Sequence, residues 1–169
     1  MHCAVIVTDC SWDQPVSWNS NCFIELGVMD SYQETVIRVR YAETDQMGVV
    51  YHANYFIWME VGRVEYCRSK GISYRDMESN DQVFLVVGEV NCRYSAPARY
   101  DDEVQIRTSI AEVNPRVVRF EYQLSTVKDA KPLATGWTKH VFCGGDKRPA
   151  KLPEKYWEMF GIPLPAASR

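Results

Sequence analysis

The chain has 169 residues, of which 46% are apolar and 24% are charged, with a formal net charge of −3. This length predicts one domain with a single core, and the composition is ordinary for a globular protein. The weak net charge argues against a nucleic-acid partner, and no apolar run approaches the roughly 20 residues of a membrane span. The N-terminal stretch has no basic region before its short apolar run, so we expect no signal peptide and a cytoplasmic location.

The six cysteines stand at positions 3, 10, 22, 67, 92 and 143, without a CxxC pair. That scatter favours reduced thiols over a disulfide framework. A zinc site built from His52, His140 and Cys143 is conceivable, but none of the spacings typical of zinc ligands supports it. We therefore expect no metal and no cofactor.

The first 33 residues differ from the rest, since they contain no Lys or Arg but three of the six Cys and two of the five Trp. They show no helix caps, heptads or sustained alternation. We interpret residues 1–33 as an N-terminal extension, either poorly ordered or the product of an upstream start codon, with Met29 as the natural first residue. The alternative is an arm that packs on the domain through Trp12, Trp18 and Phe23.

The domain itself is expected over residues 34–162, followed by a C-terminal tail at 163–169. Its first element is the alternating segment Thr35–Tyr41, which predicts a half-buried strand with Ile37, Val39 and Tyr41 on one face. The segment Ala53–Lys70 has no proline and is followed by Gly71, a pattern typical of a helix and its C-terminal cap.

Apolar residues cover much of this helix, so we expect it to be heavily buried. A short helix is predicted over Ser73–Ser79. Four strands should follow, at Phe84–Tyr94, Glu103–Val113, Val118–Leu124 and Leu133–Cys143. Short loops join them, which favours antiparallel pairing. The predicted fold is therefore α+β, with one curved antiparallel sheet wrapped around one central helix.

The turn before the long helix combines an acid, a glycine, a histidine, an asparagine and two tyrosines. It reads Tyr41-Ala-Glu-Thr-Asp45-Gln-Met-Gly48-Val-Val-Tyr51-His52-Ala-Asn54-Tyr55. This stretch resembles the signature of hotdog-fold acyl-CoA thioesterases of the 4-hydroxybenzoyl-CoA thioesterase and YbgC type. The likeness continues through Trp58-Met59-Glu60, Arg63, Glu65 and Gly71 and through Tyr100-Asp101-Asp102-Glu103-Val104, so it spans roughly Thr35 to Gly161. It implies a hotdog fold and hydrolysis of acyl-CoA to free acid and CoA.

The resemblance assigns the catalytic carboxylate to Asp45 and the carbonyl-polarising donor to the backbone amide of His52. A helix N-terminus offers unpaired N–H groups and about half a unit of positive charge to a developing oxyanion. Asp45 would attack the thioester carbonyl or activate a water molecule, and the sequence leaves both routes open. Outside such a motif, an acid in this place is usually a turn or capping residue.

Substrate contacts are expected from Gly48, Tyr51, Asn54, Tyr55, Arg116 and Arg119. Gly48 suits a turn where φ is positive or the backbone approaches a ligand closely. Tyr51 and Tyr55 would line the acyl pocket or simply pack, and Asn54 would cap the helix. Arg116 and Arg119 follow a turn and could meet the phosphates of coenzyme A, although exposed strand arginines are common.

Glu60 is the alternative catalytic acid, because other hotdog thioesterases use a carboxylate on the central helix. Its spacing to Arg63 and Glu65 favours ion pairs within the helix or between subunits instead. Asp101 and Asp102 are interpreted as a strand-entry turn rather than a second acid pair.

The resemblance also implies a homodimer or homotetramer, with the active site between subunits. The expected substrate is a short-chain or aromatic acyl-CoA, with an acyl carrier protein thioester as the alternative, and no nucleic acid. Two other functions stay open. One is a hotdog hydratase or dehydratase with Asp45 and His52 as an acid–base pair, and the other is a non-catalytic acyl-CoA-binding module.

Overall fold

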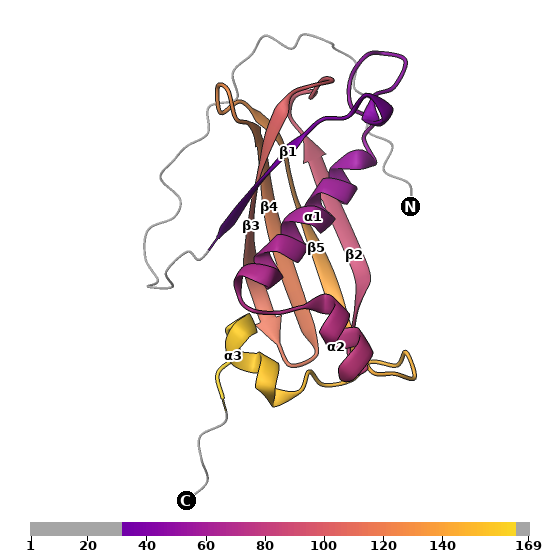
Figure 1. Ribbon diagram of the computed structural model, residues 1–169, viewed down its shortest axis with the longest axis vertical. Helices are drawn as coiled ribbons and strands as arrows, with labels where there is room; N and C mark the ends of the chain where they lie inside the picture. Colours follow the sequence, from indigo (N-terminus) through magenta and orange to yellow (C-terminus); the bar gives the residue numbers. More distant parts are fainter. Residues whose placement is uncertain (1–31, 165–169) are drawn as a thin grey trace, which may run out of the picture.

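The computed structural model describes residues 32–164. A curved antiparallel sheet wraps around one long helix, α1 (Asn54–Ser69), as Figure 1 shows. This architecture confirms the predicted α+β hotdog fold. Residues 1–31 and 165–169 lie outside the described residues. They include most of the expected N-terminal extension, Met29 as the expected natural first residue, and the end of the tail. No helix within residues 32–164 is long and apolar enough to cross a bilayer.

The strand order in the sheet is β1-β3-β4-β5-β2, and each neighbouring pair is antiparallel. The strands are β1 (Gln33–Arg38), β2 (Phe84–Tyr94), β3 (Glu103–Asn114), β4 (Val117–Thr126) and β5 (Pro132–Cys143). The short helical elements are η1 (Tyr41–Glu43), α2 (Tyr74–Asn80), η2 (Glu154–Tyr156) and α3 (Trp157–Phe160). Short turns make β3, β4 and β5 a meander, so β1 and β2 are the edge strands.

Alternation along the central strands directs one face of the sheet toward α1. The buried side chains of that face include Val104, Ile106, Val118, Phe120, Tyr122 and Leu124. From α1, the buried residues are Tyr55, Trp58, Met59, Gly62, Tyr66 and Cys67. Burying a large apolar side chain contributes about 1.5–3 kcal/mol, so this contact is the main source of stability. The prediction of a heavily buried helix is confirmed on this side, whereas Ile57 on its other side is 47% exposed.

Two glycines allow the close approach of these layers. A Cβ atom on Gly62 of α1 would stand only 2.6 Å from the Thr108 hydroxyl oxygen on β3. A Cβ atom on Gly136 of β5 would collide with the Asn91 backbone oxygen and lie 2.6 Å from the terminal methyl of Met59. Real Cβ contacts are not this short, so the spacing between helix and sheet depends on the missing side chains.

The first strand ends earlier than the sequence predicts. β1 stops at Arg38, and Tyr41, expected on its buried face, is 78% exposed in η1. Val39 is buried as expected. Val39 still pairs with Asp102, so the Arg40 backbone N–H points to the open edge of the sheet, where the Glu43 carboxylate accepts its hydrogen bond at 2.8 Å. This local side-chain-to-backbone bond holds the chain in η1, which alternation alone does not reveal.

Replacing Gly136 by alanine should lower the free energy of unfolding by about 1–3 kcal/mol, because the methyl group overpacks against Met59 and β2. Gly88→Ala on β2 is the matched control. Its Cβ atom would stand 3.6 Å from the nearest atom, so we expect a neutral result or stabilisation by up to about 1 kcal/mol. Chemical denaturation measures both. Equal stability of the two variants would contradict the close approach at Gly136.

Candidate active site

The signature segment folds into a hairpin that leads directly into α1, at the upper end of the sheet in Figure 1. Thr44 and Val50 form an antiparallel bridge, and the Asp45 N–H donates to the Val49 carbonyl at 2.9 Å. Gly48 occupies the turn with a φ of +70°, in agreement with the positive φ expected for it. The hairpin therefore carries Asp45 and the start of the helix as one connected unit.

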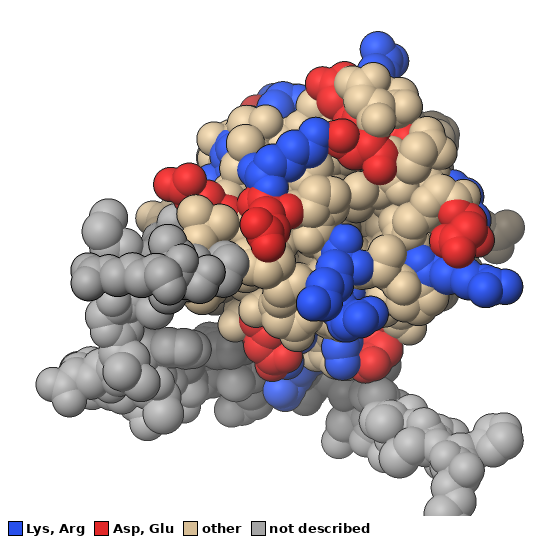
Figure 2. Space-filling model, turned by 90° about the horizontal axis from the view of Figure 1, so that it is seen from below, with Lys and Arg blue, Asp and Glu red and all other residues tan. Residues whose placement is uncertain are grey.

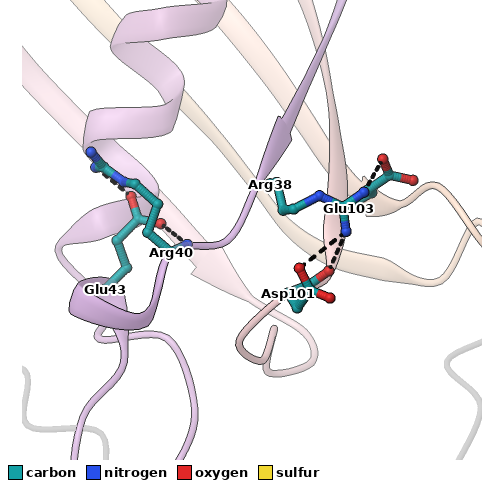
Figure 3. Close-up of polar contacts among 5 residues, drawn as sticks. All are labelled: Arg38, Arg40, Glu43, Asp101 and Glu103. Carbon is teal, nitrogen blue, oxygen red and sulfur yellow. Dashed lines mark hydrogen bonds and ion pairs between the residues drawn. The ribbon is translucent and has the colours of Figure 1, made fainter.

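A buried carboxylate, that of Glu43, anchors this unit. Its oxygens accept hydrogen bonds from the Arg40 backbone N–H and guanidinium, each at 2.8 Å (Figure 3), and from the Trp58 indole N–H at 3.1 Å. Its backbone carbonyl accepts from the Tyr51 N–H at 2.9 Å and from the Asn54 side-chain amide at 2.8 Å. Glu43 is 4% exposed. One residue thus joins the strand end, the hairpin and the helix.

Nothing in the sequence pattern pointed to a role for Glu43. Burial by itself raises the pKa of this carboxyl, but hydrogen bonds from Arg40 and Trp58 outweigh it and lower the pKa from its ordinary value of 4.5. Glu43 is therefore ionised at neutral pH inside the protein. The only local signal was an Arg–Glu pair three residues apart, a spacing too common to single out an anchor.

The helix begins without a side-chain cap. Asn54, the expected cap, is instead the first helical residue, and Ala53 takes the cap position without a side-chain hydrogen bond. The prediction was wrong because the Asn54 amide turns back to the Glu43 carbonyl. Among residues 32–164, the N–H groups of His52 and Ala53 have no hydrogen-bond acceptor. Unpaired donors at a helix start are what an oxyanion requires.

Tyr94, at the end of edge strand β2, orients one of these donors. Its hydroxyl donates to the His52 carbonyl at 3.1 Å, and its ring meets the Tyr55 ring edge-on with centroids 5.1 Å apart. In a planar trans peptide, the His52 C=O and the Ala53 N–H point in opposite directions. Holding the carbonyl therefore aims the Ala53 N–H away from Tyr94. Tyr94 carries no local sequence signal, because its partner His52 lies 42 positions away.

Asp45 combines a turn role with a free oxygen. Its Oδ1 accepts the Met47 N–H at 2.8 Å, which is the turn contact typical of an acid in this place. Its other carboxylate oxygen has no partner within the described part of the chain. The side chain is half-buried. Asp45 is therefore held in orientation by one oxygen, while the second remains available for chemistry.

The tyrosines of the motif differ in their environment. Tyr55 is 2% exposed, and its hydroxyl oxygen accepts the Ala98 N–H at 3.2 Å, so it serves packing. Tyr51 is 50% exposed, and its ring lies 4.3 Å from the exposed His52 imidazole. These two rings form part of the surface beside the helix start.

Arg116 and Arg119 lie toward the end of the sheet that is opposite to the helix start. Tyr94 of β2 and Leu124 of β4 both pair with Ala134 of β5, so they lie at one level of the sheet. Arg116 stands just before the first residue of β4, eight residues from Leu124. At about 3.4 Å per strand residue, Arg116 is roughly 25 Å from the level of Tyr94. Figure 2 looks onto this lower end, where basic side chains group near the middle of the face between separate acidic ones.

The two arginines also differ in their contacts. Arg119 binds the carboxylates of Glu112 and Glu121 and lies 5.4 Å from the centre of the Trp137 ring. Arg116 is exposed, and its side chain has no partner among residues 32–164. Of the pair, Arg116 is therefore the one that could bind a phosphate without breaking an ion pair.

The remaining acids are placed as follows. Glu60 is exposed on α1 and forms no ion pair within residues 32–164, so the expected pair with Arg63 inside the helix is absent there. Asp101 and Asp102 form the predicted turn into β3. The Asp101 carboxylate accepts a hydrogen bond from the Arg38 guanidinium at 3.2 Å, as Figure 3 shows. The Asp102 carboxylate accepts one from the Arg99 backbone N–H at 2.7 Å.

Metal-ligating residues do not gather in the described region. No group of three or more His, Cys, Asp or Glu within residues 32–164 is placed to hold a metal ion. The conceivable zinc set of His52, His140 and Cys143 is therefore not assembled. His140 is instead buried and bonded to Thr138.

Comparison with known proteins relates this geometry to one superfamily. The profile of the thioesterase-like superfamily matches residues 39–160. The putative acyl-CoA thioesterase YneP of Bacillus subtilis is 47% identical over 78 residues, which are 46% of this chain and 56% of YneP. The acyl-CoA thioesterase YbgC of Haemophilus influenzae is 34% identical over 88 residues, which are 52% of this chain and 65% of YbgC. The chain thus spans less than two thirds of the length of either relative.

A solved structure shows the same fold. The DHNA-CoA thioesterase of Staphylococcus aureus matches with a TM-score of 0.73 and 30% identity, over 77% of this chain and 89% of that one. The resemblance found in the signature segment is confirmed by these matches.

Glu43→Gln should lower the free energy of unfolding by about 1–3 kcal/mol at pH 7, because a neutral amide replaces a buried carboxylate that receives three donors. Folding lowers the pKa of Glu43, so its stabilisation is present above about pH 4.5 and is lost as the pH falls through the lowered value. The stability gap between wild type and variant should therefore shrink in acid.

Chemical denaturation at pH 7 and pH 3 measures this gap. Glu65→Gln is the matched control, since Glu65 binds Arg68 at the surface and should contribute at most about 1 kcal/mol. A gap for Glu43→Gln that stays equally large at pH 3 would show that its charge is not the stabilising feature.

Proposed function

Because the chain belongs to the thioesterase-like superfamily, we propose that it hydrolyses acyl-CoA thioesters to a free acid and coenzyme A. One observation carries the proposal. A carboxylate oxygen of Asp45 and the N–H groups of His52 and Ala53, all without partners in residues 32–164, belong to one anchored hairpin and helix start. The name of YbgC, an acyl-CoA thioesterase, and that of YneP, a putative acyl-CoA thioesterase, support the same reaction.

Asp45 is the proposed reactive group. As a nucleophile, its oxygen would bond to the thioester carbon, coenzyme A would leave as the thiolate, and water would then hydrolyse the acyl–Asp45 anhydride. As a general base, it would take a proton from the water that attacks the same carbon. Both routes place negative charge on the thioester oxygen. The backbone N–H of His52 is the proposed donor to that oxygen.

The proposed substrate contacts are Gly48, Tyr51, Asn54, Tyr55, Arg116 and Arg119. Gly48 and Tyr51 lie at the surface of the hairpin, whereas Asn54 and Tyr55 would act by shaping it. Arg116 lies at the other end of the sheet from Tyr94 and the helix start, so a phosphate contact from Arg116 is proposed to come from a second copy.

We also propose that the protein forms a homodimer or homotetramer. The edge strand β2 exposes Val86, Val87 and Val90, and α1 exposes Ile57 beside it, each between 44% and 52%. An exposed apolar edge strand is open to pairing with another chain, and a second copy would cover it. The active site would then be completed between subunits.

The acyl group is proposed to be short-chain or aromatic. The Staphylococcus aureus structure is named as a DHNA-CoA thioesterase. From that name we propose for this chain only that the substrate is a thioester of coenzyme A, and not that its acyl group is DHNA. A carrier-protein thioester is the alternative substrate. The cytoplasmic location of the protein stays a prediction from its sequence. Release of free thiol separates hydrolysis from a hydratase reaction, which leaves the thioester intact.

Asp45→Asn should lower kcat by about 10²–10⁴-fold, because the amide keeps the turn but cannot act as base or nucleophile. Affinity for acyl-CoA should be retained, since an anion beside the thioester carbonyl has been removed. Thiol release measures kcat, and circular dichroism checks folding. Glu60→Gln on α1 is the matched control and should keep most of its turnover. A folded Asp45→Asn enzyme with near-normal kcat, beside an inactive Glu60→Gln, would move the catalytic acid to the helix.

Tyr94→Phe should lower kcat by about tenfold with little change in KM, since it releases the His52–Ala53 peptide, and with it the Ala53 N–H next to the proposed donor, but removes no donor to the substrate. Direct loss of an oxyanion donor costs more, about 10²–10³-fold. Tyr100→Phe is the control, because Tyr100 is 58% exposed and its hydroxyl has no hydrogen-bond partner among residues 32–164. Steady-state kinetics of both variants test the effect. A rise in KM at constant kcat would assign Tyr94 to substrate binding instead.

A further inference from the structure

The outer face of the sheet is the one turned away from α1, behind the strands in the view of Figure 1. Its residues alternate along each strand with buried ones such as Ile106 and Leu124. A strip of uncharged polar side chains crosses this face, with the half-buried Trp137 ring among them: Asn91, Gln105, Ser109, Gln123, Ser125 and Thr135. Within residues 32–164, none of these polar side chains makes a hydrogen bond. The strip therefore holds donors and acceptors that the single chain does not use.

The outer face is hollowed along this strip. Two hollows, of about 240 Å³ and 330 Å³, are continuous with each other, since Arg107, Gln123 and Thr135 line both. The first also reaches the Trp137 ring. Hollows lined by free amides and hydroxyls suit a partner whose side chains fill them and form hydrogen bonds there.

The charged side chains of this face are paired with one another within the chain. The pairs are Glu34 with Arg107 at 2.9 Å, Glu89 with Lys139 at 3.6 Å, and Arg119 with both Glu112 and Glu121. Because acids and bases alternate, the face has no strong field of either sign and does not repel a copy of itself. A nucleic acid or an anionic membrane would need an excess of basic side chains instead.

The area of the face is close to what a stable contact needs. Strands β2 to β5 have 10 to 12 residues each, and the sheet has five strands. At about 3.4 Å per residue and about 4.8 Å between strands, the face covers about 600–800 Å². Each partner in a stable complex buries about 800 Å². Pairing of two copies through β2, as proposed above, would join their outer faces into one surface of about twice this area.

We propose that the outer face, centred on Gln123 and Thr135, binds the same face of a second copy, so that two dimers joined through β2 assemble back to back into a tetramer. The inference rests on the proposed oligomer, decides between its two forms, and does not depend on the proposed hydrolysis. A contact between identical faces requires a surface that is complementary to itself. A neutral face whose amides and hydroxyls both donate and accept meets this condition. Trp137 at its centre is a residue type enriched in interfaces.

Gln123→Arg tests the contact. Gln123 is exposed in the single chain, so the variant should fold, but the contact would bury the new cation without a free carboxylate, because Glu121 already binds Arg119. Sedimentation equilibrium of the full chain should give four copies for the wild type and two for the variant, with the tetramer–dimer dissociation constant raised at least about 10²-fold. Thr135→Arg on β5 is a second variant with the same expected effect, and circular dichroism checks folding. Ser79→Arg is the matched control, since Ser79 is exposed on α2 outside the sheet, and it should stay tetrameric.

The outcomes separate this inference from the proposed function. A wild type that sediments as a dimer or monomer at every concentration, or Gln123→Arg and Thr135→Arg proteins that both stay tetrameric, would overturn it. Monomers in either variant would overturn it as well, since the β2 contact does not include the middle of the face. Thiol release by the dimeric variants should stay close to that of the wild type, because neither substitution touches the hairpin or the helix start. A wild type that releases no thiol would overturn the proposed hydrolysis, while sedimentation would still decide this inference.

Discussion

The burial of one carboxylate, that of Glu43, is the constraint on which the end of β1, the hairpin and the start of α1 all depend. Donors reach it from Arg40 on the strand side and from Trp58 on the helix side. An ionised group can stay inside a protein only while its donors are in place, because a buried charge without partners is costly. The position of the helix start relative to the hairpin is therefore set by a charge, and not by apolar packing alone.

The same anchor also shapes the start of α1. The Asn54 side chain, which could cap a helix, is bonded to the Glu43 carbonyl instead. The Asn54, Tyr55 and Phe56 N–H groups donate to the carbonyls of the preceding turn, at Tyr51, His52 and Ala53. The N–H groups of His52 and Ala53 lie just before the helix and have no acceptor among residues 32–164, which makes them the donors of the proposed site.

The helix α1 does not follow the usual pattern, in which apolar side chains are buried and polar ones are exposed. Ile57 is largely exposed on the helix, while Thr138 and His140 are buried beneath it. The exposed apolar surface suits contact with a second copy, and the buried polar groups are bonded to each other. Close packing through Gly62 and Gly136 keeps the helix near these strands. The exposed side of α1 is therefore a reasonable part of a contact between subunits.

The sequence by itself determined the long helix α1, the four later strands and the fold class, but not where β1 ends. Alternation over β3 and β4 allows one register, since a shift by one residue would expose the core face. Asp45 and His52 could be located because they share one contiguous stretch. Only the tertiary structure decided which side chains meet across distance. Tyr94 reaches His52 from 42 positions away, and Arg63 shares a cavity with His140 on another element. The reason is physical: local patterns encode which face is buried, whereas the partner of a buried polar group is set by the packing of whole elements.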